Sequence, residues 1–96
     1  MSDDEHQLRA ERDEGHRARM LVENPLWVEA WDRIETGLME TWRNSQPADS
    51  ERRESIYLQL DAARAVRRYF EQLVLTGEMA EMTLSERSDG RSTAQH

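Results

Sequence analysis

The three tryptophans of this 96-residue chain fall within one short stretch, between Trp27 and Trp42. Large apolar side chains recur there at positions 27, 31, 34, 38 and 42, in steps of four, three, four and four residues. This spacing is the period of an α-helix and not the alternation of a β-strand. The first and last tryptophans therefore lie about 22 Å apart along one face of one helix. The fold has to cover this long apolar face.

Local signals define where this helix begins and ends. Asn24 is a strong N-cap residue, and proline is favoured at the first helical position, which Pro25 would occupy. Because the residue before a proline resists helical backbone angles, a preceding helix must end before Asn24. Pro47 ends the pattern on the other side. We predict one helix over residues 6–22 and a second over residues 25–43.

A third and longer helix is predicted over residues 50–76, with Asp49 or Ser50 as its N-cap. Its apolar positions step by four, three, three, four and three residues, which is close to heptad spacing. These positions are Ile56, Leu60, Ala63, Val66, Phe70 and Leu73. Gly77 follows directly and is predicted to be a C′ glycine in the left-handed conformation.

The rest of the chain is more polar. Residues 78–84 contain four apolar side chains and predict a last short helix, so that the helical domain spans residues 6–84. Residues 1–5 and 85–96 are predicted to be disordered, because they have too little apolar surface to bury. Two interior glycines remain: Gly15 weakens its helix by about 1 kcal/mol relative to alanine, and Gly37 fits either a close helix approach or a position without special importance.

These elements predict an all-α fold: an antiparallel hairpin of helices 25–43 and 50–76, with an additional N-terminal helix. A chain this short has a thin core, and without cysteine it lacks disulfides, so we expect oligomerisation to complete a helical bundle. The predicted core comprises Trp27, Trp31, Ile34, Leu38, Trp42, Ile56, Leu60, Ala63 and Val66. The predicted interface between copies comprises Tyr57, Leu58, Tyr69, Phe70, Leu73 and Val74. For the tryptophans, the alternatives to the hairpin core are a subunit interface and stacking against a ligand or nucleic acid.

The sequence contains no pattern typical of catalysis. It has no glycine-rich phosphate loop, no cysteine nucleophile and no serine–histidine–aspartate arrangement. His6 and His16 lie about 15 Å apart on a helix, too far to share a metal ion. We therefore predict a protein that is not an enzyme and that has no catalytic residues, metal or cofactor.

Charge and hydropathy restrict the partners. The net charge of −7 argues against a protein that simply coats DNA or an anionic membrane. No apolar run approaches the roughly 20 residues that span a bilayer, and the acidic start is unlike a signal peptide. We expect a cytoplasmic protein without a membrane partner. Arg64, Arg67 and Arg68 form a basic strip that could contact phosphate; the alternative is ion pairing with the acidic residues of helix 25–43 or of another copy.

The order of boundary signals resembles short helical proteins of tailed phages and prophages. The resemblance rests on Glu23-Asn24-Pro25-Leu26, Trp42, the loop from Pro47 to Ser50, Arg53-Glu54 and Thr76-Gly77, and it covers residues 18–84. It implies a role in virion morphogenesis or DNA packaging, in the host cytoplasm or in association with the virion, and it implies no active site. Small terminase subunits, which are small helical oligomers that help to select or hand over DNA, are one such family. This chain lacks the helix-turn-helix domain that would precede the hairpin in that family.

Three functions remain open at this point. The first is a non-enzymatic assembly subunit whose partners are further copies of itself and another phage structural or packaging protein. The second is a packaging adaptor that binds nucleic acid through Arg64, Arg67 and Arg68. The third is a small acidic regulator of a basic protein. Oligomeric mass and salt-dependent DNA retention distinguish the first two.

Overall fold

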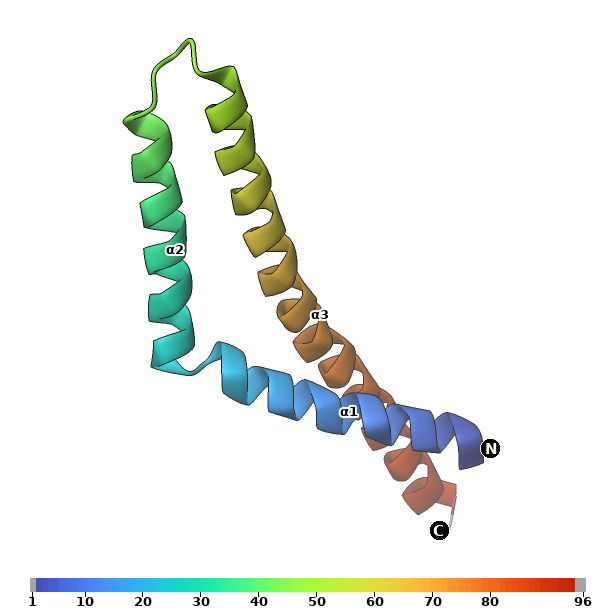
Figure 1. Ribbon diagram of the computed structural model, residues 1–96. Coiled ribbons are helices and arrows are strands. Elements are labelled where there is room, and N and C mark those ends of the chain that lie inside the picture. Colours follow the sequence, from blue (N-terminus) through green and yellow to red (C-terminus); the bar gives the residue numbers. More distant parts are fainter. Residues whose placement is uncertain (1, 95–96) are drawn as a thin grey trace.

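The computed structural model describes residues 2–94, and these form three helices: α1 (Ser2–Val22), α2 (Pro25–Arg43) and α3 (Ser50–Ala94). No strand occurs among these residues, so the all-α prediction is confirmed. Figure 1 shows α1 and α3 crossing near the two chain ends, while α2 stands beside the first part of α3. None of the three helices, over the residues described, is long and apolar enough to cross a membrane.

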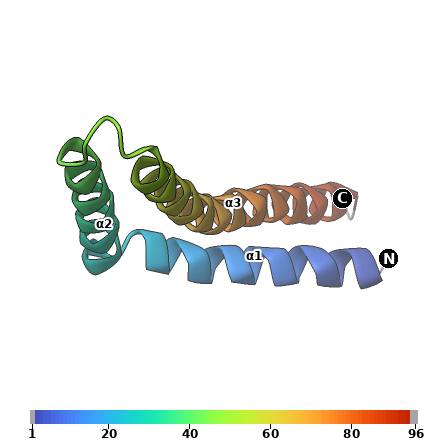
Figure 2. The ribbon, with the colours of Figure 1, turned by 45° about the horizontal axis from the view of Figure 1, so that its top comes forward.

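The molecule is extended. Its principal dimensions are 72 × 25 × 16 Å and its radius of gyration is 20.5 Å, whereas a compact domain of about 100 residues has a radius near 13 Å. Along most of its length α3 has one helix beside it, α2 in its first half and α1 in its second half (Figures 1 and 2). The pairing of α1 with α3 is the more extensive of the two.

The N-caps follow the sequence signals. The side chain of Asn24 accepts a hydrogen bond from the backbone N–H of Leu26 at 2.8 Å, and Pro25 opens α2. At the start of α3, the carboxylate of Asp49 accepts from the backbone N–H of Arg52 at 3.2 Å. Asp49 is thus the N-cap residue, one of the two alternatives that the sequence allowed. Both caps satisfy helix-end donors that would otherwise lack a partner.

The prediction that a helix ends at Gly77 is wrong. The helix α3 continues through this residue to Ala94, and no glycine among the described residues has a positive φ. The separate helix 78–84 is therefore part of α3. The apolar or small positions 70, 73, 77, 80 and 84 keep a heptad-like spacing across the glycine. One side of the continuous helix can therefore pack against a neighbouring helix.

The predicted disorder at the chain ends is also wrong for most of these residues. Residues 2–5 belong to α1 and residues 85–94 belong to α3, while residues 1, 95 and 96 lie outside the described part. The two ends run side by side, and Arg87 donates to the carboxylate of Asp4 at 2.6 Å. Each terminal helix segment thus has a neighbour that composition alone does not reveal.

The helices α1 and α3 touch through their backbones at Gly15 and Gly77. A Cβ atom added to Gly15 would lie 2.6 Å from the Cα of Gly77, and one added to Gly77 would lie 2.7 Å from the Cα of Gly15. Both distances are too short for any side chain. By contrast, nothing lies within 4 Å of a Cβ added to Gly37. The close approach that could have explained Gly37 therefore occurs at the other two glycines.

Small residues and ion pairs continue the contact on both sides of this crossing. Ala18 and Ala80 are 4% and 3% exposed, respectively. Along the edges, Arg19 pairs with Glu78, and the imidazole of His16 lies 3.3 Å from the carboxylate of Glu81. These edge pairs are exposed, so each contributes little to stability. They match an antiparallel alignment, in which later residues of α1 lie against earlier residues of α3.

The hairpin of α2 and α3 is closed at its loop by Arg53. Its Nε donates to the hydroxyl of Ser45 at 2.9 Å and one terminal nitrogen donates to the carbonyl of Ser45 at 3.3 Å. The guanidinium carbon lies 4.3 Å from the ring centroid of Trp42, a cation–π contact. Ser45 in turn donates to the carbonyl of Trp42 at 2.6 Å. One arginine thus joins the end of α2, the loop and the first turn of α3.

The apolar interior is small. The buried apolar residues of the described part are Ala18, Ile56, Leu60 and Ala80. Of the other predicted core residues, Trp27, Trp31, Leu38 and Ala63 are half-buried, whereas Ile34, Trp42 and Val66 are exposed. These last three are exposed in the single chain because only one helix flanks each part of the hairpin. The core prediction did not include Ala18 of α1 and Ala80 of α3, which are buried on either side of the helix crossing.

We expect Gly77→Ala to destabilise the fold by about 1–3 kcal/mol, because the added methyl group overlaps the backbone of α1. Gly37→Ala is the matched control, since it adds the same atom in open space and should stabilise α2 by about 0.5–1 kcal/mol. Urea unfolding followed by circular dichroism, at one protein concentration, measures both. If Gly77→Ala were as stable as Gly37→Ala, the backbone contact would be disproved.

We expect Arg53→Ala to cost about 1–3 kcal/mol, because it removes two hydrogen bonds to Ser45 and the contact with Trp42. Arg52→Ala makes the same chemical change one residue earlier, where the side chain is exposed, and should stay within about 0.5 kcal/mol of the unmodified protein. Equal effects of the two changes on the urea midpoint would refute the role given to Arg53.

Candidate interaction surface

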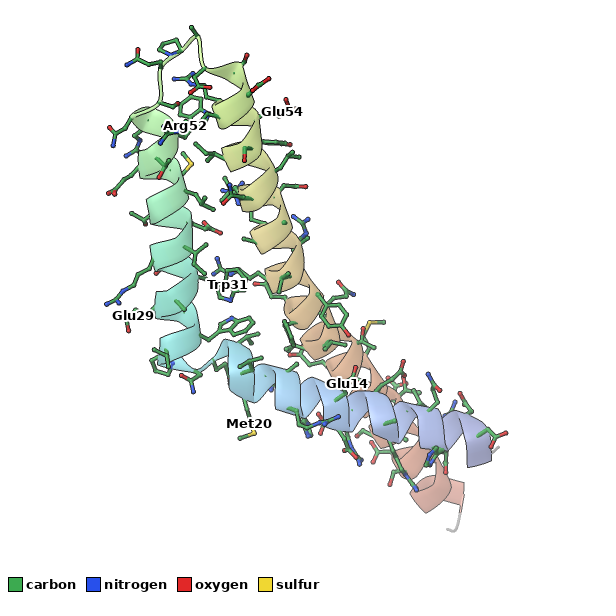
Figure 3. All side chains as sticks on the ribbon, in the orientation of Figure 1. Glu14, Met20, Glu29, Trp31, Arg52 and Glu54 are labelled. Atoms are coloured by element: carbon green, nitrogen blue, oxygen red, sulfur yellow. The ribbon has the colours of Figure 1, made fainter. Side chains whose placement is uncertain are left out.

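The most unusual feature of the surface is the number of large apolar side chains that it exposes. Two groups lie on α3. The first faces a groove beside α1, and the second lies mainly on the other side of α3, with Met79 at its edge bordering α1. A third, smaller group lies at the corner between α1 and α2, where Met20 is 76% exposed and points away from the other helices (Figure 3).

The first group, here named the groove face, consists of Leu58, Ala62, Val66 and Tyr69. Steps of four, four and three residues place these side chains on one side of α3. All four residues are exposed. Tyr69 is 60% exposed and also borders the groove. This face leads directly to the end of α1, where the chain turns away towards α2.

A groove of about 430 Å³ opens at that point between α1 and α3. It is lined by Glu14, Arg17, Ala18, Leu21, Tyr69, Phe70 and Leu73. Its floor is apolar, and one acidic and one basic residue lie on its α1 side. An apolar side chain from another molecule could enter this groove while the charged rim stays in water.

Four aromatic rings connect the groove to the hairpin. The ring of Phe70 packs edge-to-face with those of Tyr69 and Trp27, with centroids 5.3 Å apart in each case. Trp27 packs edge-to-face with Trp31 at 5.4 Å. Trp31 lies between α2 and α3, whereas Glu29 lies on the outer side of α2 (Figure 3). Such pairs add to the gain from apolar burial, so these tryptophans hold α2 against α3.

The second group, here named the methionine stripe, consists of Leu75, Met79 and Met82. These side chains are 52%, 69% and 63% exposed. Their steps of four and three residues place them on one side of α3. Sequence reasoning missed this stripe because it assigned the residues after Gly77 to another helix. The signal that could have found it is the helical spacing, which continues unbroken through Gly77.

The predicted interface residues fall into two sets. Tyr57, Leu58 and Tyr69 are exposed, as an interface between copies requires, whereas Phe70, Leu73 and Val74 are half-buried. Phe70 and Leu73 face α1 and the base of α2, which cover part of their surface. The N-terminal helix of the same chain thus occupies part of the surface that the sequence assigned to a second copy.

The arginine strip is partly occupied by Glu35 of α2. The carboxylate of Glu35 lies 3.4 Å from a terminal nitrogen of Arg67 and 3.8 Å from the Nε of Arg64. Arg68 has no ion-pair partner among the described residues. Two of the three arginines thus take part in joining α2 to α3.

Comparison with models of known protein families, with curated proteins and with solved structures finds no match to this chain.

We expect the protein not to retain duplex DNA at physiological salt, because its net charge is −7 and two arginines of the strip face Glu35. Gel-shift titration at low and physiological salt measures the retention. Glu35→Gln, which frees the guanidinium groups, serves as the comparison and should increase binding at low salt. Salt-resistant binding of the unmodified protein that Arg68→Ala abolishes would contradict this expectation.

Proposed function

We propose that this chain is a non-enzymatic assembly subunit that associates with further copies of itself through the exposed faces of α3. The observation that carries the proposal is the contrast between four buried apolar residues in the described part and the many large apolar side chains that stay exposed. A stable small protein usually needs more buried area than this, or else a disulfide, a metal or a second subunit.

The arrangement of the exposed residues supports association and not random exposure. Small monomers rarely expose contiguous apolar patches, and larger patches mark sites of interaction. The groove face and the methionine stripe each follow a helical spacing and lie on one long helix. A helix with two such faces can contact two neighbours, which is what a subunit of a larger assembly needs.

The resemblance to short phage proteins supplies the context of the proposal, namely a phage or prophage particle or its DNA-packaging machinery. Another structural or packaging protein would then be a further partner. The packaging adaptor that binds nucleic acid is less well supported, because Glu35 pairs with Arg64 and Arg67. The acidic surface would also suit a regulator of a basic protein, but no particular contact favours that function.

The test is the mass of the full chain in solution. We expect sedimentation velocity from low to high micromolar concentration to give species heavier than the 11.3 kDa monomer. Leu58→Glu together with Tyr69→Glu should lower the mass by placing charges on the groove face, with helix content unchanged by circular dichroism. The matched control, Glu29→Gln on the outer side of α2, should leave the mass unchanged.

A concentration-independent mass of 11.3 kDa would overturn the proposal. An oligomer that persists in the double variant would instead place the association on another surface, and the methionine stripe would be the next one to alter.

A further inference from the structure

Leu75 and Met82 of the methionine stripe lie opposite the side of α3 that α1 covers, and Met79 lies at the edge of the stripe, where it also borders a hollow lined by Leu8 and Glu11 of α1. The residues that face α1 include Leu73, Gly77 and Ala80, and each member of the stripe follows one of them by two positions. Side chains two positions apart on an α-helix point in directions that differ by about 200°. A neighbour on the stripe would therefore add a helix to the free side of α3 without displacing α1.

The stripe belongs to a longer exposed line with a symmetric spacing. Positions 64, 68, 71, 75, 79, 82 and 86 are all exposed, and their steps are four, three, four, four, three and four residues. The sequence of steps reads the same in both directions from Leu75. A helix with such a line can meet an identical helix that runs in the opposite direction, with every position of the line opposite another one.

The charges along this line differ between its two ends. Arg64, Arg68 and the acidic Glu71 precede Leu75, so the first end carries a net positive charge, and Glu86 follows it. Neither Arg68 nor Glu86 has an ion-pair partner in the described part of the chain. The guanidinium group of Arg64 comes no closer than 3.8 Å to the carboxylate of Glu35, so this pair is a long one. An antiparallel neighbour would bring opposite charges together at both ends, whereas a parallel neighbour would bring like charges together.

We propose that two copies pair antiparallel through this line, with the two-fold axis at Leu75. Leu75 then lies against Leu75 of the second copy, Arg64 lies against Glu86, and the methylene stem of Arg68 covers Met82. The remaining pair sets Met79 against Glu71, whose carboxylate lies at the edge. This pairing rests on the proposed function, because it specifies the partner and the register of one of the two faces of α3.

The absence of cysteine from the chain allows a direct test of the register. In Leu75→Cys the only thiol lies at the two-fold axis, so mild oxidation should convert most of the protein into a disulfide-linked dimer with unchanged helix content. Met20→Cys is the control: its thiol would be more exposed than that at position 75 but far from the axis, and it should stay mainly uncross-linked.

Charge exchange tests the direction of the pairing. Arg64→Glu and Glu86→Arg should each weaken dimerisation by roughly five- to thirtyfold, since the two-fold axis repeats every pair. The combined variant should recover most of the affinity, because each pair regains opposite charges. Arg52→Glu changes the net charge as Arg64→Glu does, but off the line, and should have little effect.

The outcomes separate this inference from the proposed function. Cross-linking of the Leu75→Cys variant with recovery in the combined charge variant would support the pairing. If the protein is oligomeric but Leu75→Cys does not cross-link, or the combined variant does not recover, the pairing is overturned and the assembly function stands. A monomeric unmodified protein would overturn both.

Discussion

The contact of two helix backbones at Gly15 and Gly77 is the constraint on which the rest of the molecule depends. An interior glycine costs a helix up to about 1 kcal/mol relative to alanine, so two of them weaken α1 and α3 unless something offsets that cost. The close approach brings Ala18 against α3 and Ala80 against α1, and both become buried. It also aligns the polar edges of the helices, from Arg19 and Glu78 to Asp4 and Arg87. Helix packing thus compensates locally for poor helix propensity.

The same contact explains why so much of α3 stays exposed. Because α1 is held against the second half of α3, it ends before the first half, which has only α2 beside it (Figure 1). The rings of Trp27 and Phe70 and the contacts of Arg53 hold that pair together at its two ends. No third helix of the described chain covers the hairpin between these points. Ile34 and Val66, which have the spacing of core residues, are consequently exposed.

Much of the local structure could be predicted from the sequence, because it depends on neighbouring residues. The start of α2 follows from Asn24 and Pro25, and its face follows from the spacing of the tryptophans. The role of Gly77 could not be predicted in this way. A glycine after a long apolar run fits a helix C-terminus equally well, and only the second glycine across from it distinguishes the two cases. For the same reason nothing local distinguishes Gly37, beside open space, from Gly15.

The error at Gly77 also determined how much of the interaction surface could be predicted. If the helix ended there, the directions of Leu75 and Met82 would be unrelated, and no common surface would follow from their spacing. A continuous helix fixes their relative rotation, so the side chains after the glycine extend the exposed face that begins at Arg64. Gly77 allows the backbone of α1 to approach one side of α3. Because α3 continues as a helix through Gly77, the line of exposed residues on the other side is unbroken. A single backbone contact thereby fixes the position of the N-terminal helix and the surface left for a second molecule.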